Sequence, residues 1–93
     1  MRKRISEEER ARMHGYLDDA IDKMDSDKNR KKKHWSLLSS RVLGKMAVNK
    51  SHELELAIME GEPKRIESEC HDIINIGIME IDNLYSNLPK DGE

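Results

Sequence analysis

This sequence of 93 residues has no phenylalanine, and its aromatic residues are one tryptophan and two tyrosines. With so few rings, the core must be filled mainly by isoleucine, leucine, methionine and valine. Apolar residues make up 35% of the chain and charged residues 39%. We therefore expect one small domain over residues 1–93. The helix predicted from Pro63 is apolar over well more than half of its circumference, which is more than one small bundle would cover, so we also expect self-association.

Cysteine is also scarce, since Cys70 is the only one. A single thiol excludes an internal disulfide, and no CxxC or histidine–cysteine spacing suggests zinc. Cys70 falls among apolar residues, so we expect an inert buried thiol. No apolar run approaches about 18 residues, and charges rather than an apolar signal core follow Met1. These absences predict a cytoplasmic protein with no membrane partner.

Neither sign of charge dominates, because 17 basic residues are set against 19 acidic ones and the net charge is −2. Proteins whose main task is to neutralise nucleic-acid phosphates are usually strongly basic. We therefore do not expect nucleic acid as a partner, and a helical protein whose basic linker touches nucleic acid is the most distant interpretation. A small anionic ligand is compatible with this balance.

A capping box marks the first predicted helix, because Ser6 and Glu9 have the Ser-x-x-Glu spacing. Apolar residues at steps of three and four follow, and they predict a helix over 7–24. Residues 25–34 contain no apolar residue and are expected to form a basic linker. We expect flexible tails over residues 1–5 and 89–93.

The basic linker ends in four consecutive cationic residues, Arg30 to Lys33, and Trp35 follows almost at once. One interpretation is a solvated connection, and the other is a loop that faces phosphate. Trp35 can likewise cover a core edge or stack on a base. The sequence leaves both pairs of alternatives open.

The second half of the chain predicts two antiparallel helices. Ser36 can cap the first of these, but Gly44 and Asn49 weaken its middle, so the pattern leaves open whether it runs unbroken to Glu60. Gly61 suits the position just past a helix end, and Pro63 suits the first turn of the next helix. With no strand-like alternation, we expect an all-α fold, a small antiparallel bundle of three to four helices completed by homo-oligomerisation.

The last predicted helix, over 63–88, has a broad apolar stripe that we expect to face the core. Its members recur at steps of three and four: Ile66, Cys70, Ile73, Ile74, Gly77, Ile81, Leu84, Tyr85 and Leu88. Glu69 and Asp72 fall on another side of this helix, beside Ile76 and Met79. A solvated face would carry polar neighbours instead, so these acids are expected to need a partner.

The turn at Gly61 also brings Glu53 of the preceding helix alongside Glu69 and Asp72. Converging carboxylates on two helices can hold magnesium, which takes a few carboxylates together with waters and substrate phosphates. Such an ion neutralises phosphate charge and activates a bound water. The alternative from spacing alone is that the three are surface acids.

Five segments together carry a family resemblance. They are Lys33-His34-Trp35, residues 52–58 (HELELAI), Glu60-Gly61-Glu62-Pro63, residues 66–75 (IESECHDIIN) and Met79-Glu80-Ile81-Asp82. This pattern resembles the MazG-like all-α nucleoside triphosphate pyrophosphohydrolases. The resemblance covers roughly residues 31–84, and Glu69-x-x-Asp72-x-x-Asn75 is its most specific part.

The resemblance implies a homodimer or homotetramer that uses Mg2+, or alternatively Mn2+, to hydrolyse a nucleoside triphosphate to monophosphate and pyrophosphate. It implies a metal-activated water as the nucleophile. It assigns Glu53, Glu69 and Asp72 as catalytic metal ligands, Asn75 as a polar contact on the metal side or the substrate side, and Lys31, Lys33 and Trp35 as residues near phosphate and base. Outside the family pattern, we expect the Asn49 amide oxygen as a further, uncharged metal ligand and Lys50 as a residue near the substrate.

One departure from the family pattern matters. The family has a pair of glutamates where this chain has Asn49-Lys50. Lys50 brings a positive charge where a negative one is expected, and it can instead contact a phosphate as a point charge. The alternative function is therefore a MazG-like module without catalysis, which binds or senses a nucleotide or a protein partner without turnover.

Overall fold

In the computed structural model, residues 4–26, 29 and 31–86 are described, and within them every regular element is a helix. The elements in order are α1 (Glu7–Met24), the short 3-10 helix η1 (Trp35–Leu37), α3 (Ser40–Glu60) and α4 (Pro63–Ser86). The predicted all-α fold is therefore confirmed. Among the described residues, no helix combines the length and apolar character needed to cross a membrane.

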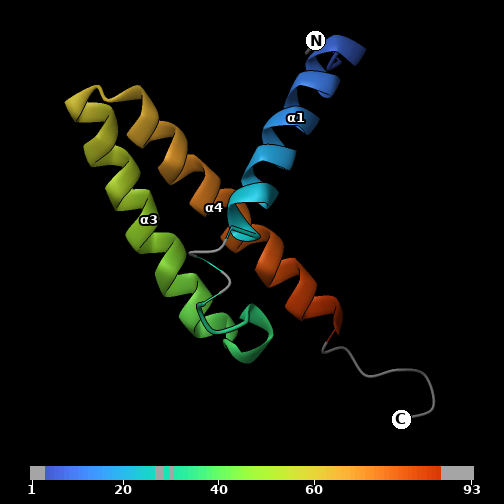
Figure 1. Cartoon of the computed structure of the whole chain (residues 1–93), viewed down its shortest axis with the longest axis vertical. Coiled ribbons are helices and arrows are strands. Elements are labelled where there is room, and N and C mark those ends of the chain that lie inside the picture. Colours follow the sequence, from blue (N-terminus) through green and yellow to red (C-terminus); the bar gives the residue numbers. More distant parts are fainter. Residues whose placement is uncertain (1–3, 27–28, 30, 87–93) are drawn as a thin grey trace.

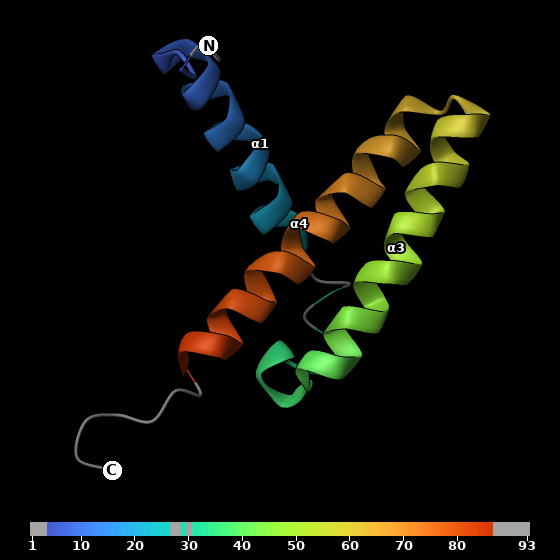
Figure 2. The same cartoon turned by 180° about the vertical axis from the view of Figure 1, so that it is seen from behind.

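Helices α3 and α4 lie side by side as an antiparallel hairpin, and α1 packs on the middle of α4 (Figure 1). Seen from behind, the carboxyl-terminal end of α1 meets α4 while its amino-terminal end points away (Figure 2). In the described part of the chain α1 contacts α4 but not α3. The result is an open arrangement in which α4 is the shared element.

The first helix is confirmed with the bounds that its sequence predicts. The Ser6 hydroxyl accepts from the Glu9 amide at 3.1 Å, and the Glu9 carboxylate accepts from the Ser6 amide at 3.0 Å. These reciprocal bonds satisfy two of the free amides of the first turn. Of the predicted tails and linker, residues 1–3, 27–28, 30 and 89–93 lie outside the described residues.

The helix that Ser36 was predicted to cap begins three residues later than predicted, at Ser40, so that prediction is wrong. Ser36 lies in η1, and α3 is capped by Ser39, whose hydroxyl accepts from the Val42 amide at 3.2 Å. The reason lies on α4, where the Asn83 amide donates to the carbonyls of Trp35, at 2.9 Å, and Leu38, at 3.3 Å. These bonds hold residues 35–38 against α4. From Ser40, α3 continues unbroken to Glu60.

The predicted turn between α3 and α4 is confirmed. Gly61 adopts a left-handed conformation with φ of 69°, and its amide donates to the carbonyls of Ala57 and Ile58. α4 then starts at Pro63, whose missing N–H costs nothing in a first turn. This turn sets which residues of α3 and α4 face each other.

The apolar stripe of α4 does not form the core as predicted, because Ile81, Leu84 and Tyr85 are exposed and Ile66, Ile73 and Ile74 are only half-buried. Leu88, its last predicted member, lies outside the described residues. Cys70 is half-buried rather than buried. The packed side of α4 is instead the acidic one, since its buried residues are Glu69, Asn75, Ile76 and Asn83. Polar contacts explain the inversion: the side-chain amides of Asn75 and Asn83 reach backbone carbonyls of α1 and of residues 35–38. The buried hydrophobic residues are Ala20, Leu43, Ala57 and Ile76.

Two glycines of the hairpin should respond oppositely to alanine. Gly61→Ala forces a side chain into the left-handed region, so we expect the free energy of unfolding to fall by about 1 kcal/mol. Gly44 lies inside α3 with no atom within 4 Å of an added Cβ, so Gly44→Ala should raise it by roughly 0.5–1 kcal/mol. Urea denaturation measures both. Equal effects of the two substitutions would contradict the assigned turn.

Candidate functional site

Three carboxylates meet around one lysine between α3 and α4. The Lys50 Nζ lies 3.1 Å from Glu53 Oε2, 3.5 Å from Glu69 Oε2 and 3.1 Å from Asp72 Oδ2. Lys50 and Asp72 are equally far from Gly61 along the chain, so the antiparallel hairpin places them opposite each other. We call Glu53, Glu69 and Asp72 the acidic cluster. The structure therefore brings the three predicted acids together, with an ammonium group between them.

A second lysine reaches the cluster from α1. The Lys23 Nζ lies 2.8 Å from Asp72 Oδ1 and donates to the hydroxyl of Ser68, at 2.7 Å, and to its carbonyl, at 3.1 Å. Each Asp72 oxygen therefore has its own ammonium partner. Asp72 consequently links all three helices through charge.

The ion pair between Lys50 and Glu69 matters for stability because the Glu69 carboxylate is buried. Glu69 is only 9% exposed, and its Oε2 makes no hydrogen bond in the described structure. The Lys50 ammonium at 3.5 Å is therefore the contact that offsets the burial of this charge. Lys50 is therefore the cation that lies beside the buried carboxylate of Glu69.

The pKa values of the cluster reflect the same contacts. Burial works against the charge of Lys50, but hydrogen bonds and charge from the cluster, above all Asp72, outweigh it and raise the pKa of Lys50. Burial likewise raises the pKa of Asp72, but Lys23 and Lys50 together hold it below its ordinary value. The hydrogen bond from Lys50 is the largest cause that lowers the pKa of Glu53. At neutral pH Lys50, Asp72 and Glu53 are therefore charged.

The predicted magnesium site can be tested against this arrangement. Magnesium needs oxygens at about 2.0–2.1 Å in an octahedron, and the Lys50 ammonium already occupies the point that the three acids share. Within the described ranges, no three or more His, Cys, Asp or Glu side chains are placed to hold a metal. Asn49, the further predicted ligand, is exposed on α3. The donors as arranged here do not fit the ion, and magnesium or manganese binding stays a prediction.

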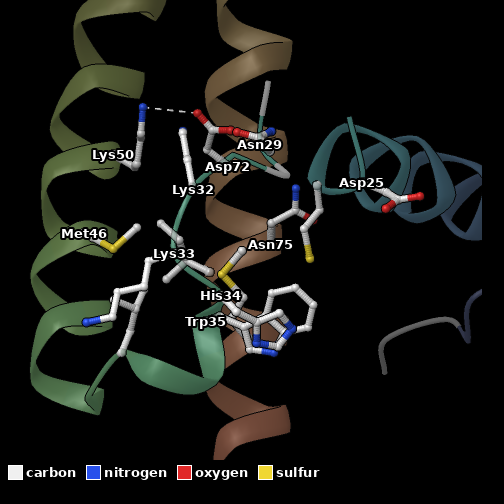
Figure 3. Close-up of a pocket in the computed structure, with 14 residues that line it drawn as sticks. Asp25, Asn29, Lys32, Lys33, His34, Trp35, Met46, Lys50, Asp72 and Asn75 are labelled. Atoms are coloured by element: carbon white, nitrogen blue, oxygen red, sulfur yellow. Dashed lines mark ion pairs between the residues drawn. The ribbon is translucent and has the colours of Figure 1, made fainter. Parts of the chain in front are cut away.

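A pocket of about 550 Å³ adjoins the cluster. Figure 3 shows Lys32, Lys50 and Asp72 at one end of it and His34 and Trp35 at the other. Its polar lining comprises Asp25, Asn29, Lys32, Lys33, His34, Lys50, Asp72 and Asn75. Its apolar and aromatic lining comprises Met24, Trp35, Leu38, Met46, Ile76 and Met79. The pocket thus combines cationic and acidic groups, apolar side chains and aromatic rings.

The aromatic end is held in place by α4. The Trp35 indole N–H donates to Asp82 Oδ2 at 2.9 Å, and the ring stacks on His34 with centroids 3.9 Å apart. The His34 Nδ1 in turn lies 2.8 Å from the Ser36 hydroxyl. Trp35 therefore lines the pocket as a positioned ring. The basic linker is more than a solvated connection, because Lys32 and Lys33 also line the pocket.

Four of the five predicted substrate residues line the pocket. Lys33, Trp35, Lys50 and Asn75 line the pocket, whereas the exposed Lys31 does not. Asn75 is 5% exposed and donates to the Ala20 carbonyl at 2.7 Å, so its amide joins α4 to α1. Sequence reasoning missed Lys32 and His34. In the sequence, these two residues were marked only by lying in the basic segment before Trp35. That segment follows an irregular path, so no periodicity could predict which of its side chains point into the pocket.

We expect acid to lower the free energy of unfolding, because it protonates carboxylates of the acidic cluster. The pKa values of Asp72 and Glu53 lie below the ordinary 3.8 and 4.5, so their ionised forms stabilise the fold. That contribution is complete above the ordinary values and is lost as pH falls through the lowered ones. We expect the free energy of unfolding, measured with urea, to drop as pH falls below about 4.5.

The variant Lys50→Met should lose much of this acid sensitivity, because protonation then relieves repulsion between uncompensated carboxylates. The matched control is Lys45→Met, which removes an exposed lysine of the same helix outside the cluster. An acid dependence of Lys50→Met equal to that of the wild type would contradict the central role of Lys50.

Comparisons with family models, curated proteins and solved structures found no match for this chain. The resemblance to the MazG-like proteins therefore rests on the residues of the sequence alone. Its metal ligands, substrate residues and assembly stay predictions.

Proposed function

We propose that this chain binds a nucleoside phosphate in the pocket between α3, α4 and residues 31–38, as a MazG-like module that senses or holds its ligand without turnover. The observation that carries the proposal is the two-ended pocket. Lys32 and Lys50 lie at one end beside Asp72, the His34 and Trp35 rings lie at the other, and Met46 lies between the two ends.

The chemistry of the two ends matches the two parts of a nucleotide. Lys32 and Lys33 supply positive charge for phosphate oxygens, and lysine binds phosphate as a point charge. Stacking of a base on an aromatic ring contributes about 1–3 kcal/mol and tolerates any base. The volume of about 550 Å³ also falls in the usual range for small-molecule pockets. An amphipathic anion of this size is the ligand that the lining favours.

Binding without turnover follows from Lys50. Metal-activated hydrolysis needs carboxylates that are free to hold a cation. Here the ammonium of Lys50 engages all three acids that the resemblance assigns to the metal. A cytoplasmic location suits such a ligand and the single cysteine, and we include it in the proposal.

The second candidate is Mg-dependent hydrolysis of a nucleoside triphosphate to monophosphate and pyrophosphate. It is favoured by one observation: acids from two helices reach a common point, as a metal site would require. For hydrolysis to occur, Lys50 must move away from the three acids when substrate and metal enter. The flexible side chain of lysine allows such a movement.

Nucleotide binding can be measured through Trp35, the single tryptophan, whose fluorescence should change on titration with ATP, GTP, CTP or UTP. We expect Lys32→Ala and Lys33→Ala each to weaken binding about tenfold, a loss of about 1.4 kcal/mol. Lys31→Ala is the matched control, since this neighbouring lysine does not line the pocket and should bind as the wild type does.

Other outcomes decide between the candidates. Pyrophosphate release that requires magnesium and disappears in Glu69→Gln would establish the hydrolase instead. If none of the four triphosphates binds, or if Lys31→Ala weakens binding as much as Lys33→Ala, the pocket is not the nucleotide site.

We also propose that two copies of the chain associate through the apolar stripe of α4. Ile81, Leu84 and Tyr85 are 58%, 54% and 69% exposed. Apolar side chains that gather on one exposed helix face are typical of a surface that binds another protein.

A double variant tests this association. Ile81→Glu with Leu84→Glu places two charges on the stripe, so we expect a mass near one chain by light scattering where the wild type gives at least two. Glu67→Lys, an exposed position of α4 outside the stripe, is the control and should leave the mass unchanged. A monomeric wild type would refute the assembly.

A further inference from the structure

We infer that Asn75 recognises the sugar of a bound nucleotide. Its side-chain oxygen accepts a hydrogen bond from the 2′ or the 3′ hydroxyl, so the pocket selects ligands whose sugar carries this donor. The role of Asn75 rests on the proposed nucleotide binding and adds a requirement on the sugar, which the lysines and rings of the pocket do not impose.

The two polar atoms of the Asn75 side chain differ in what they contact. Its Nδ2 donates to the Ala20 carbonyl at 2.7 Å, whereas its Oδ1 is buried and makes no hydrogen bond among the described residues. Chemistry fixes which atom is which, because a carbonyl only accepts and so the amide nitrogen must face Ala20. Asn75 is 5% exposed, and a buried acceptor without a donor costs free energy. Its oxygen is therefore the polar atom that remains for a ligand.

The chemistry of this oxygen limits what it can bind. Asn75 belongs to the lining of the pocket, so a ligand in the pocket is its available partner. An amide oxygen accepts but does not donate, and the partner must therefore carry an O–H or N–H group. Ionised phosphate oxygens are acceptors as well and cannot pair with it. The sugar and the base are the parts of a nucleotide that can donate.

The position of Asn75 along α4 favours the sugar. Asp72, which contacts Lys50 at the lysine end of the pocket, precedes Asn75 by roughly 4.5 Å along the helix axis. Asp82, which accepts from Trp35 at the aromatic end, follows Asn75 by roughly 10 Å. Figure 3 shows the same order, with Asn75 between Asp72 and Trp35. With phosphate at the lysine end and the base on the rings, the sugar is the part that lies beside Asn75.

Ligands that differ only at the sugar test this role in the wild-type protein. Titration of Trp35 fluorescence compares ATP with its 2′-deoxy, 3′-deoxy and 2′,3′-dideoxy analogues. We expect the dideoxy analogue to bind at least about tenfold more weakly than ATP, because it leaves Asn75 Oδ1 buried and unpaired. A single deoxy analogue that shares the loss identifies the hydroxyl that donates.

The ligand series separates this role from nucleotide binding itself. Equal binding of ATP and the dideoxy analogue overturns the role of Asn75 and leaves the proposed function intact. If no triphosphate binds, the proposed function fails and the role of Asn75 fails with it.

Two variants assign the preference to the oxygen of Asn75. Asn75→Leu removes the acceptor and keeps a side chain of similar size, so the preference for ATP over the dideoxy analogue should disappear. This variant also loses the bond to Ala20 and loosens α1. Lys23→Met is the matched control, because it removes the contacts of α1 with Ser68 and Asp72 but leaves the Asn75 oxygen in place, and it should keep the preference.

Two results of this comparison overturn the inference. One is a folded Asn75→Leu that still prefers ATP, and the other is a loss of preference in Lys23→Met as well, which would assign the effect to the attachment of α1. NMR gives a measurement that needs no variant: the side-chain carbonyl carbon of Asn75 should shift when ATP binds and shift less when the dideoxy analogue binds. An equal response to the two ligands contradicts a hydrogen bond from the sugar.

Discussion

The ion pairs of Lys50 are the constraint on which the rest of this structure depends. They join facing positions of α3 and α4 and allow acidic residues to lie on the packed side of α4. Because Asp72 also pairs with Lys23, the same charges attach α1. Only four apolar residues are buried in the described core, so polar contacts carry much of the specificity of packing. Lys50 and Asp72 also line the pocket, so the same contacts fix one part of its lining.

The elements that local sequence determines could be predicted well. The capping box at Ser6 and the turn at Gly61 each depend on a few adjacent residues, and the structure has both. The convergence of Glu53, Glu69 and Asp72 was also accessible, because a tight turn between two helices fixes which positions face each other. The same argument identifies Lys50 as the partner of Asp72. Reading Lys50 only as a phosphate contact overlooked that the nearest negative charges belong to the chain itself.

Hydrophobic periodicity could not predict which side of α4 packs or where α3 begins. Helix α4 is apolar around much of its circumference, so hydrophobic spacing could not decide which side packs. That choice depends on Asn75 and Asn83, whose amides reach carbonyls far away in the sequence. The start of α3 was misplaced for a related reason, because Asn83 holds residues 35–38 in another conformation. Long-range hydrogen bonds from side chains leave no local pattern.

The attachment of α1 has a practical consequence. Its described polar links to α4, through the backbone carbonyl of Ala20 and the ammonium of Lys23, lie near its carboxyl-terminal end, while its amino-terminal end extends away from the hairpin (Figure 1). A surface or reporter coupled to that end would stand clear of both the pocket and the turn at Gly61. Tethering through the first turn of α1 is therefore the orientation in which an immobilised molecule keeps its pocket accessible to solutes.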